Sequence, residues 1–114
     1  VYGDGSNWRP FIHVRDAARA YADAAVRPDR WPELVYNVGA NEENYRIETV
    51  AETVDTVLDR SLEIHYLEEK RPGPSYHVNF DRLSETGFET EWSLRESVRV
   101  LADRLRGSKV SVTA

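Results

Sequence analysis

The sequence contains neither cysteine nor methionine. Without cysteine, disulfides, thiolate nucleophiles and cysteine-bound zinc are excluded, and a reducing cytoplasm is the expected compartment. The lack of methionine means either that an initiator was removed or that translation began before residue 1. No apolar run approaches the ~20 residues that a membrane-spanning helix needs, and the first residues do not form a signal-peptide pattern. We therefore expect no membrane partner.

Positive charge is also scarce, since 15 Lys and Arg against 20 Asp and Glu leave a net charge of -5. This is the wrong sign for binding nucleic acid through the overall field, so we expect no nucleic-acid partner and infer that any bound anion is held locally. The chain has 114 residues, of which 40% are apolar and 31% charged. That length and balance predict one folded domain.

Hydrophobic spacing predicts short strands and helices, so the expected fold class is α/β. Asp16 is the predicted N-cap of an alanine-rich helix, and Ser93 with Glu96 forms the S-x-x-E capping box of the last helix. The predicted elements are strands over 11–14, 34–38 and 62–66, a further segment at 76–80, and helices over 17–25, 47–58, around Leu83 up to Gly87, and 93–105.

The strand predicted over 34–38 is apolar without alternation. Such a pattern suits a strand buried on both faces of a parallel sheet. It therefore requires strand partners on both sides, whereas the alternating pattern over 62–66 predicts a half-buried strand.

Three motifs favour ordinary structural roles. Gly3-Asp4-Gly5 begins like a G-x-G-x-x-G dinucleotide loop, but the third glycine position is Trp8 and no helix opens there, so a tight turn is favoured. The three histidines lack the spacing of metal ligands, and the paired glutamates lie in predicted loops where carboxylates are usually solvated. These patterns predict neither a metal site nor an acid/base pair.

Arg9 lies between Trp8 and Pro10, where a side chain can project from a rigid strand. A guanidinium there can fork onto two phosphate oxygens, since it is planar and permanently charged. The alternative is a surface arginine stacked on Trp8. Arg71, beside a Pro/Gly loop, has the same two interpretations, and the residues alone leave both open.

Residues 1–20 resemble the G-D-G-x-x-x-R-x-F-I-H-V-x-D-x-A-R-A stretch of extended short-chain dehydrogenases/reductases, the NAD-dependent nucleotide-sugar epimerases and dehydratases. The resemblance continues through nearly the whole chain in the family's order. Its further segments are Val35-Tyr36-Asn37-Val38-Gly39, Tyr45-Arg46-Ile47, Tyr76-His77-Val78-Asn79-Phe80, Gly87-Phe88 and the helix from Ser93 to Leu105.

The resemblance implies a part of such an enzyme. The family's cofactor loop, G-x-x-G-x-x-G, is absent, and only Tyr66 with Lys70 has the spacing of the catalytic Tyr-x-x-x-Lys, on a predicted strand where the motif requires a helix. Residues 1–107 are therefore expected to be the C-terminal, substrate-binding portion without the dinucleotide-binding Rossmann half, and 108–114 a flexible tail. No cofactor is expected to bind to this chain alone, while NAD or NADP is expected for the complete enzyme.

The same resemblance implies a substrate site for a nucleotide-diphospho-sugar. Tyr2 would lie against the nucleotide base, Arg9 would clamp the pyrophosphate, and Asn37 would contact the substrate phosphate or sugar. Arg71 is the candidate second phosphate clamp. The loop after it departs from the family's pattern, because it is two residues short when aligned on Arg71 and carries Pro74 in place of an arginine when aligned on Tyr76.

Three functions remain open at this point. The chain is the substrate-binding part of a sugar-nucleotide epimerase or dehydratase that is inactive alone, a non-catalytic module for nucleotide-sugar binding or partner pairing, or a degenerate chain with a structural role. In each case the apolar segment 34–38 would expose an unpaired edge. We therefore predict self-association or pairing with a separate cofactor-binding chain.

Overall fold

The structure is a computed structural model that describes residues 1–69, 71 and 73–107. Its α/β organisation agrees with the expected fold class. Residues 108–114, predicted as a tail, lie outside the described part, as do Lys70 and Pro72. The elements in chain order are strand β1 (Trp8–Pro10), helix α1 (Val14–Val26), the 3-10 turns η1 (Pro28–Arg30) and η2 (Asn41–Glu43), strand β2 (Asn44–Arg46), and helices α2 (Ile47–Val57), α3 (Asp81–Ser84) and α4 (Leu94–Arg106).

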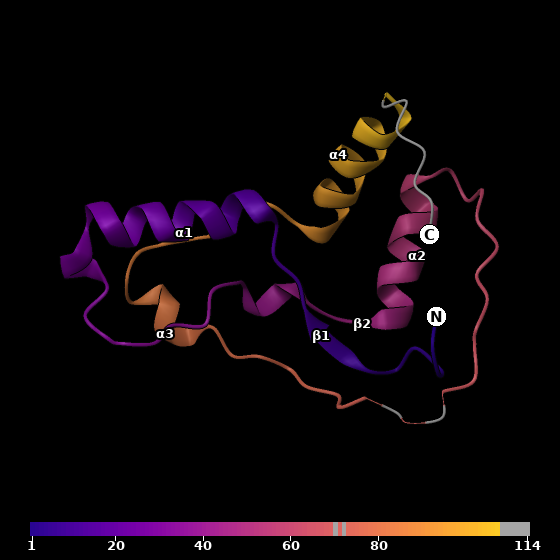
Figure 1. The fold of residues 1–114 in the computed structure, drawn as a ribbon, viewed down its shortest axis with the longest axis horizontal. Coiled ribbons are helices and arrows are strands. Elements are labelled where there is room, and N and C mark those ends of the chain that lie inside the picture. Colours follow the sequence, from indigo (N-terminus) through magenta and orange to yellow (C-terminus); the bar gives the residue numbers. More distant parts are fainter. Residues whose placement is uncertain (70, 72, 108–114) are drawn as a thin grey trace.

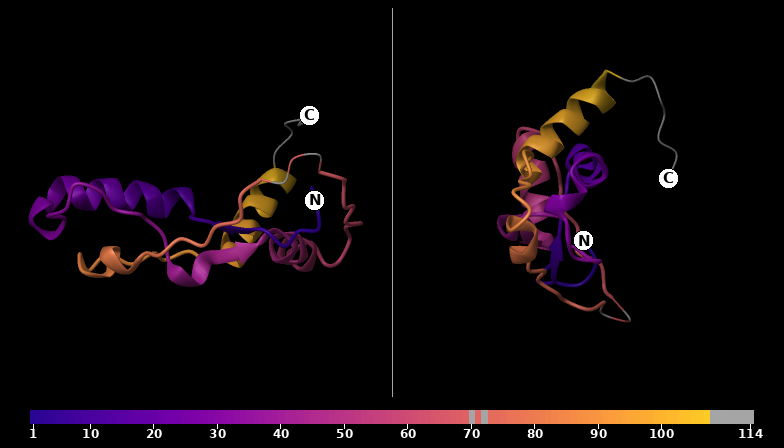
Figure 2. Two further views of the ribbon diagram at one scale, coloured as in Figure 1. Left: turned by 90° about the horizontal axis from the view of Figure 1, so that it is seen from below. Right: turned by 90° about the vertical axis from the view of Figure 1, so that its left-hand side faces the viewer.

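The molecule is long and thin, with principal extents of 48 × 36 × 23 Å. Helix α1 forms one arm above α3, α2 and α4 lie together at the other end, and β1 and β2 join the two ends (Figure 1). The chain between α2 and α3 runs around the outside of α2 and returns along one edge. Views from two further sides confirm the shallow shape (Figure 2), which leaves room for only a small core.

The sheet has two short antiparallel strands in the described residues. Trp8 pairs with Arg46, Arg9 with Tyr45 and Pro10 with Asn44. The strand predicted over 11–14 is therefore wrong in position, because β1 ends at Pro10 and α1 begins at Val14.

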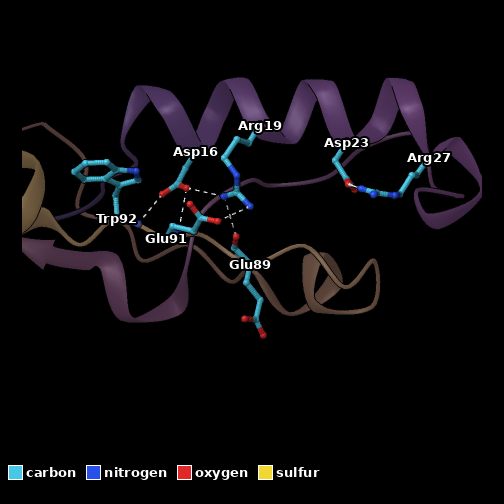
Figure 3. A network of polar contacts seen from close by, with 7 residues as sticks. All are labelled: Asp16, Arg19, Asp23, Arg27, Glu89, Glu91 and Trp92. Atoms are coloured by element: carbon cyan, nitrogen blue, oxygen red, sulfur yellow. Dashed lines mark hydrogen bonds and ion pairs between the residues drawn. The ribbon is translucent and has the colours of Figure 1, made fainter.

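Asp16 is not the N-cap of α1. His13 has the extended cap conformation, and its Nδ1 accepts the backbone N–H of Arg15 at 2.9 Å, so the helix begins earlier than predicted. Asp16 is instead fully buried, and its two carboxylate oxygens accept the N–H groups of Glu91 and Trp92, both at 3.0 Å. Figure 3 shows this carboxylate between α1 and the 89–92 loop.

Arg19 completes the connection between α1 and that loop. Its Nη1 donates to Asp16 Oδ1 at 3.0 Å and to the Glu89 carbonyl at 3.3 Å, and its Nη2 pairs with Glu91 at 3.2 Å. Further along α1, Asp23 accepts hydrogen bonds from Arg27 and from the Trp31 indole. One polar side of α1 thus holds the 89–92 loop that follows α3 and the turn at Trp31 that follows α1 itself.

The core lies between α1 and α3. Ala20 of α1, Leu83 of α3 and Phe88 are buried together, and Trp31 and Val38 pack against them. A small alanine at this point allows α1 to approach the aromatic rings closely. Two further residues are buried. Phe80 lies directly before α3, and Leu94 is the first residue of α4.

Helices α2 and α4 agree with their predicted positions. Ser93 is the N-cap of α4, and its Oγ accepts the Glu96 N–H at 3.2 Å, as expected from the capping box. The carboxylate of Glu43, the last residue of η2, also accepts the N–H of Leu94 at 2.8 Å, so the turn before β2 and the start of α4 are joined directly.

The strands predicted over 34–38 and 62–66 do not form in the described residues. Segment 34–38 is without ladder hydrogen bonds, and Leu34 is fully exposed. Segment 62–66 ends beside a single parallel bridge between Tyr2 and Leu67. A strand exists only with a neighbour to accept and donate its hydrogen bonds. The described residues provide none for the backbone of 34–38, and 62–66 has only the amine of Val1, which donates to the His65 carbonyl at 2.8 Å.

Segment 76–80 is extended and is held by side chains. The Asn44 amide accepts the Val78 N–H and donates to the Val78 carbonyl, both at 2.9 Å. Asn41 Oδ1 accepts the Phe80 N–H at 2.8 Å. Two asparagines thus replace the neighbouring strand that this segment would otherwise need.

Candidate functional site

Arg9 projects from β1 and is held by two neighbours. Its Nη1 donates to the carbonyl of Trp8 at 2.7 Å, and its Cζ lies 4.7 Å from the centre of the Tyr76 ring. Among the described residues no carboxylate lies within ion-pair distance of this guanidinium. The arginine is therefore positioned and still has donors available for an anion.

The loop at 73–76 packs against Arg9. The N–H of Trp8 donates to Ser75 Oγ at 3.0 Å, and the N–H of Tyr76 donates to the Trp8 carbonyl at 3.2 Å. A Cβ at Gly73 would lie 3.2 Å from Arg9 Nη2, so glycine allows the close approach. Arg71 is exposed two residues before Gly73, on the loop that packs on Arg9.

The alternative, in which Arg9 stacks on Trp8, is wrong, because Arg9 stacks on a different aromatic ring. Trp8 instead lies 5.3 Å from the Arg46 guanidinium and 5.2 Å from the His77 ring, whereas Arg9 stacks on Tyr76. Sequence reasoning missed Tyr76 as a support for Arg9. The chain returns to β1 only after the long 58–75 connection, and no local pattern in the sequence encodes that return.

Asn37 lies beside the extended segment 76–80, which also carries Tyr76. Its Nδ2 points to the Asn79 carbonyl at 3.5 Å, and it lines a hollow of about 270 Å³ with Val35, Asn79, Phe80 and Arg82. Tyr76 and Asn79 are three residues apart, which corresponds to about 10 Å of extended chain. Arg9 and Asn37 therefore lie against two positions of one segment without a contact between them.

Tyr2 is exposed at the N-terminal bridge to Leu67. No described residue hydrogen bonds with its hydroxyl or stacks on its ring. Of the four predicted site residues, the structure thus brings the loop of Arg71 to Arg9 and leaves Tyr2 and Asn37 apart from them.

The Gly3-Asp4-Gly5 turn has a packing role and does not have the form of a dinucleotide loop. Gly5 is buried with a φ of 76°, and a Cβ there would lie 2.9 Å from Glu48 Cβ, so this glycine allows packing against α2. A strand follows the turn where a cofactor loop would open a helix. Tyr66, the predicted chance match to the catalytic tyrosine, is not in a helix.

The described part of the chain contains no group of three or more His, Asp or Glu side chains placed to hold a metal ion. None of the helices in this described part is long and apolar enough to cross a membrane.

Tyr45, opposite Arg9 in the sheet, is held in its neutral form. Burial raises the pKa of Tyr45 to about 12, and its hydrogen bond to Glu43 adds to the effect. The hydroxyl donates to Glu43 Oε2 at 2.8 Å, the same oxygen that accepts the Leu94 N–H. Tyr45 consequently acts as a fixed donor that joins β2 to α4 rather than as an acid or base near neutral pH.

Comparisons with known proteins agree with the resemblance. Residues 1–39 match the NAD dependent epimerase/dehydratase family. The chain is 31% identical over 108 residues to the low-salt glycan biosynthesis protein Agl12 of Haloferax volcanii, covering 94% of this chain and 34% of that protein. These findings support a relationship to the NAD-dependent epimerases and dehydratases.

The fold comparison points the same way. The crystal structure of dTDP-glucose 4,6-dehydratase from Bacillus anthracis in complex with NAD superimposes with a TM-score of 0.73 over 93% of this chain and 33% of that chain, at 22% sequence identity. The chain thus has the fold of one part of that dehydratase, and it spans about a third of the length of both relatives.

Proposed function

We propose that this chain is the substrate-binding part of an NAD(P)-dependent enzyme that epimerises or dehydrates a nucleotide-diphospho-sugar. Support comes from the similarity over 94% of the chain to a glycan biosynthesis protein and from the family match over residues 1–39. The single observation that carries the proposal is Arg9, a guanidinium held by Trp8 and Tyr76 with no carboxylate partner in the described residues.

In this proposal Arg9 binds the diphosphate by a two-pronged hydrogen bond, which fixes orientation as well as charge. Arg71 is the second contact to the diphosphate, Tyr2 lies against the base, and Asn37 contacts the substrate phosphate or sugar. Binding energy from the nucleotide then holds the sugar in place for chemistry performed elsewhere. NAD or NADP would bind to residues other than the described ones and supply the oxidation and reduction of the sugar.

Calorimetric titration with UDP-, dTDP- and GDP-sugars tests the proposal. We expect one of these series to bind, and Arg9→Ala to weaken its binding by about tenfold to a hundredfold through loss of charge-assisted hydrogen bonds. Arg99→Ala, at an exposed position of α4, is the matched control that removes the same charge. Equal affinity of the Arg9→Ala variant and the parent chain contradicts the role of Arg9.

The alternative is a non-catalytic module that binds a nucleotide-sugar or a partner, and the comparisons do not favour it. The DNA sequence upstream of the Val1 codon distinguishes the two functions. A continuous reading frame that encodes a glycine-rich cofactor loop supports the enzyme part, whereas a start codon directly before Val1 supports the separate module.

A further inference from the structure

His13 connects the first turn of α1 to the loop that precedes α4. Its Nδ1 accepts the backbone N–H of Arg15 at 2.9 Å, so this side chain caps the helix. Its ring also stacks on the indole of Trp92, with the ring centres 4.3 Å apart and the planes inclined by 19°. Figure 3 shows Trp92 beside the start of α1, where the imidazole thus makes two separate contacts.

The cap requires one charge state and one tautomer of the imidazole. Nδ1 accepts a hydrogen bond only while it carries no hydrogen, so the ring must be neutral and its hydrogen must be on Nε2. In the protonated ring both nitrogens are donors, and the hydrogen on Nδ1 would face the N–H of Arg15. Protonation of His13 therefore replaces a hydrogen bond with two opposed donors.

The positive charges around His13 also oppose its protonation. The N-terminus of a helix carries a partial positive charge, which disfavours a cation at the cap. The Trp92 ring attracts a cation to its face, but the guanidinium of Arg15 already lies 5.5 Å from the centre of that ring. A protonated His13 would be a second cation beside the same indole, so the arrangement favours the neutral imidazole.

The carboxylates around His13 are engaged in other contacts. Asp16, in the first turn of α1, accepts from the Arg19 guanidinium and from two N–H groups of the 89–92 loop, and Glu91 of that loop pairs with Arg19. Glu43 lines the same small pocket as His13, and its Oε2 already accepts two hydrogen bonds. The α4 residues of this pocket are uncharged, namely Leu94, Ser97, Val98 and Leu101. Within the described part of the chain no carboxylate lies within ion-pair distance of His13, so a proton there has no local counter-charge.

We propose that His13 is a pH-sensitive latch between the first turn of α1 and the loop before α4. The neutral ring keeps the latch closed, and protonation breaks the cap and releases the first turn of α1 from the Trp92 ring. Histidine side chains ordinarily take up a proton near pH 6.5, so the stabilisation is present above about pH 7 and is lost as the pH falls below that range. The inference is independent of the proposed function, because Arg9 keeps its own contacts with Trp8 and Tyr76.

Urea unfolding of the full chain at pH 7.5 and at pH 5.5, at one chain concentration, tests the latch. His13→Asn keeps a capping acceptor at both pH values, because an amide oxygen does not titrate in this range. Between the two pH values we expect the unfolding equilibrium constant of the parent chain to rise about three- to fivefold more than that of His13→Asn. His65→Gln and His77→Gln remove the other two histidines one at a time and should respond to pH as the parent chain does. An equal response of the parent chain and His13→Asn overturns the proposal.

A second measurement uses the parent chain alone, so it remains decisive if His13→Asn does not fold. Long-range ¹H–¹⁵N NMR spectra of ¹⁵N-labelled chain distinguish a protonated ring nitrogen from an unprotonated one. At pH 7.5 we expect the hydrogen of His13 on Nε2, with Nδ1 unprotonated. As the pH falls to 5.5, the backbone amide signal of Arg15 and the indole signals of Trp92 should shift together with the His13 ring. A hydrogen on Nδ1 at pH 7.5, or an Arg15 amide signal that stays in place while His13 takes up a proton, contradicts the latch.

Discussion

Arg9 combines a fixed position with an open set of donors. The Trp8 carbonyl holds Nη1, and the Tyr76 ring lies against the guanidinium plane, so little rotamer freedom remains to be lost when an anion binds. A lysine at this position would keep the charge without the planar fork or the stacking. The geometry of the group, more than its charge, should therefore determine how well it binds a diphosphate.

This argument predicts the behaviour of Arg9→Lys. We expect diphosphate binding to weaken by about tenfold, because one of two parallel hydrogen bonds is lost. Calorimetry with the nucleotide-sugar that binds the parent chain measures the effect, and circular dichroism checks that the variant is folded. An affinity equal to that of the parent chain would show that bidentate geometry is not the source of binding.

Tyr45 gives the stability of the chain a pH dependence. The pKa of this phenol is raised from 10.0 to about 12 in the folded chain by burial and by Glu43. The neutral phenol therefore stabilises the fold fully below about pH 10, and this contribution is lost as the pH rises through 12. Its upper limit is about 3 kcal/mol, since one pKa unit corresponds to about 1.4 kcal/mol, and solvent around this partly exposed ring lowers the contribution below that limit.

Urea unfolding between pH 9 and pH 12 checks this dependence. Tyr45→Phe cannot ionise, so its free energy of unfolding should decline less over that range than that of the parent chain. The other five tyrosines remain in both chains and act as an internal reference. Parallel pH profiles of the two chains would contradict the assignment to Tyr45.

At the residue level the sequence predicted that Arg9 projects from a strand, and the structure agrees. It did not predict Tyr76 as its support or the burial of Asp16. Both depend on loops that return from more than 60 residues away, at 76 and at 91–92. Local sequence predicts that an aspartate near the start of a helix is its N-cap. Here the Asp16 carboxylate instead accepts N–H groups of a segment distant in sequence.

Among the elements, α1 and the 89–92 loop depend on the Asp16 carboxylate. Asp16→Ala would leave the N–H groups of Glu91 and Trp92 without acceptors and the Arg19 guanidinium without one partner. Buried donors left unpaired cost about 1–3 kcal/mol each, so we expect the unfolding free energy to fall by about 3 kcal/mol.

Urea unfolding of Asp16→Ala measures that loss, with Asp29→Ala as the control. Asp29 is an exposed carboxylate of η1 that no described residue pairs with, and its removal should change the free energy by less than about 0.5 kcal/mol. Asp16→Asn keeps one acceptor oxygen and should lie between the two. Comparable stabilities for Asp16→Ala and Asp29→Ala would mean that the loop is held by other contacts.

Helices were predicted from the sequence better than strands for a physical reason. The hydrogen bonds of α2 and α4 are internal to each helix, so local spacing and the Ser93 cap suffice to define them. Segments 34–38 and 62–66 have the composition of strands, but a strand needs neighbours. The composition of 34–38 therefore specifies a pairing that the described residues do not contain, and that of 62–66 a pairing that is reduced to a single bridge at Leu67.

On the scale of the whole molecule, the chain is more extended than a compact domain of its length. Its radius of gyration is 16.7 Å, against about 13 Å expected for a compact domain of this length. The apolar side chains of Val14, Tyr21, Val26, Leu34 and Val35 are mostly exposed on α1 and on the adjoining segment. A thin molecule with a small core and this much apolar surface is expected to bury it against another surface.

We therefore predict that the isolated chain associates through α1 and segment 34–38, either with a second copy or with a separate chain that binds the cofactor. Light scattering after size exclusion should give a mass above 13.1 kDa at tens of micromolar. Leu34→Lys should reduce association, because a charge at an unpaired strand edge opposes pairing. Leu105→Lys makes the same change at an exposed leucine of α4 and should not. A compact and stable monomer of the parent chain at that concentration would mean that the exposed edge is tolerated in water, and the 34–38 segment would then have no need of the partner that its composition predicts.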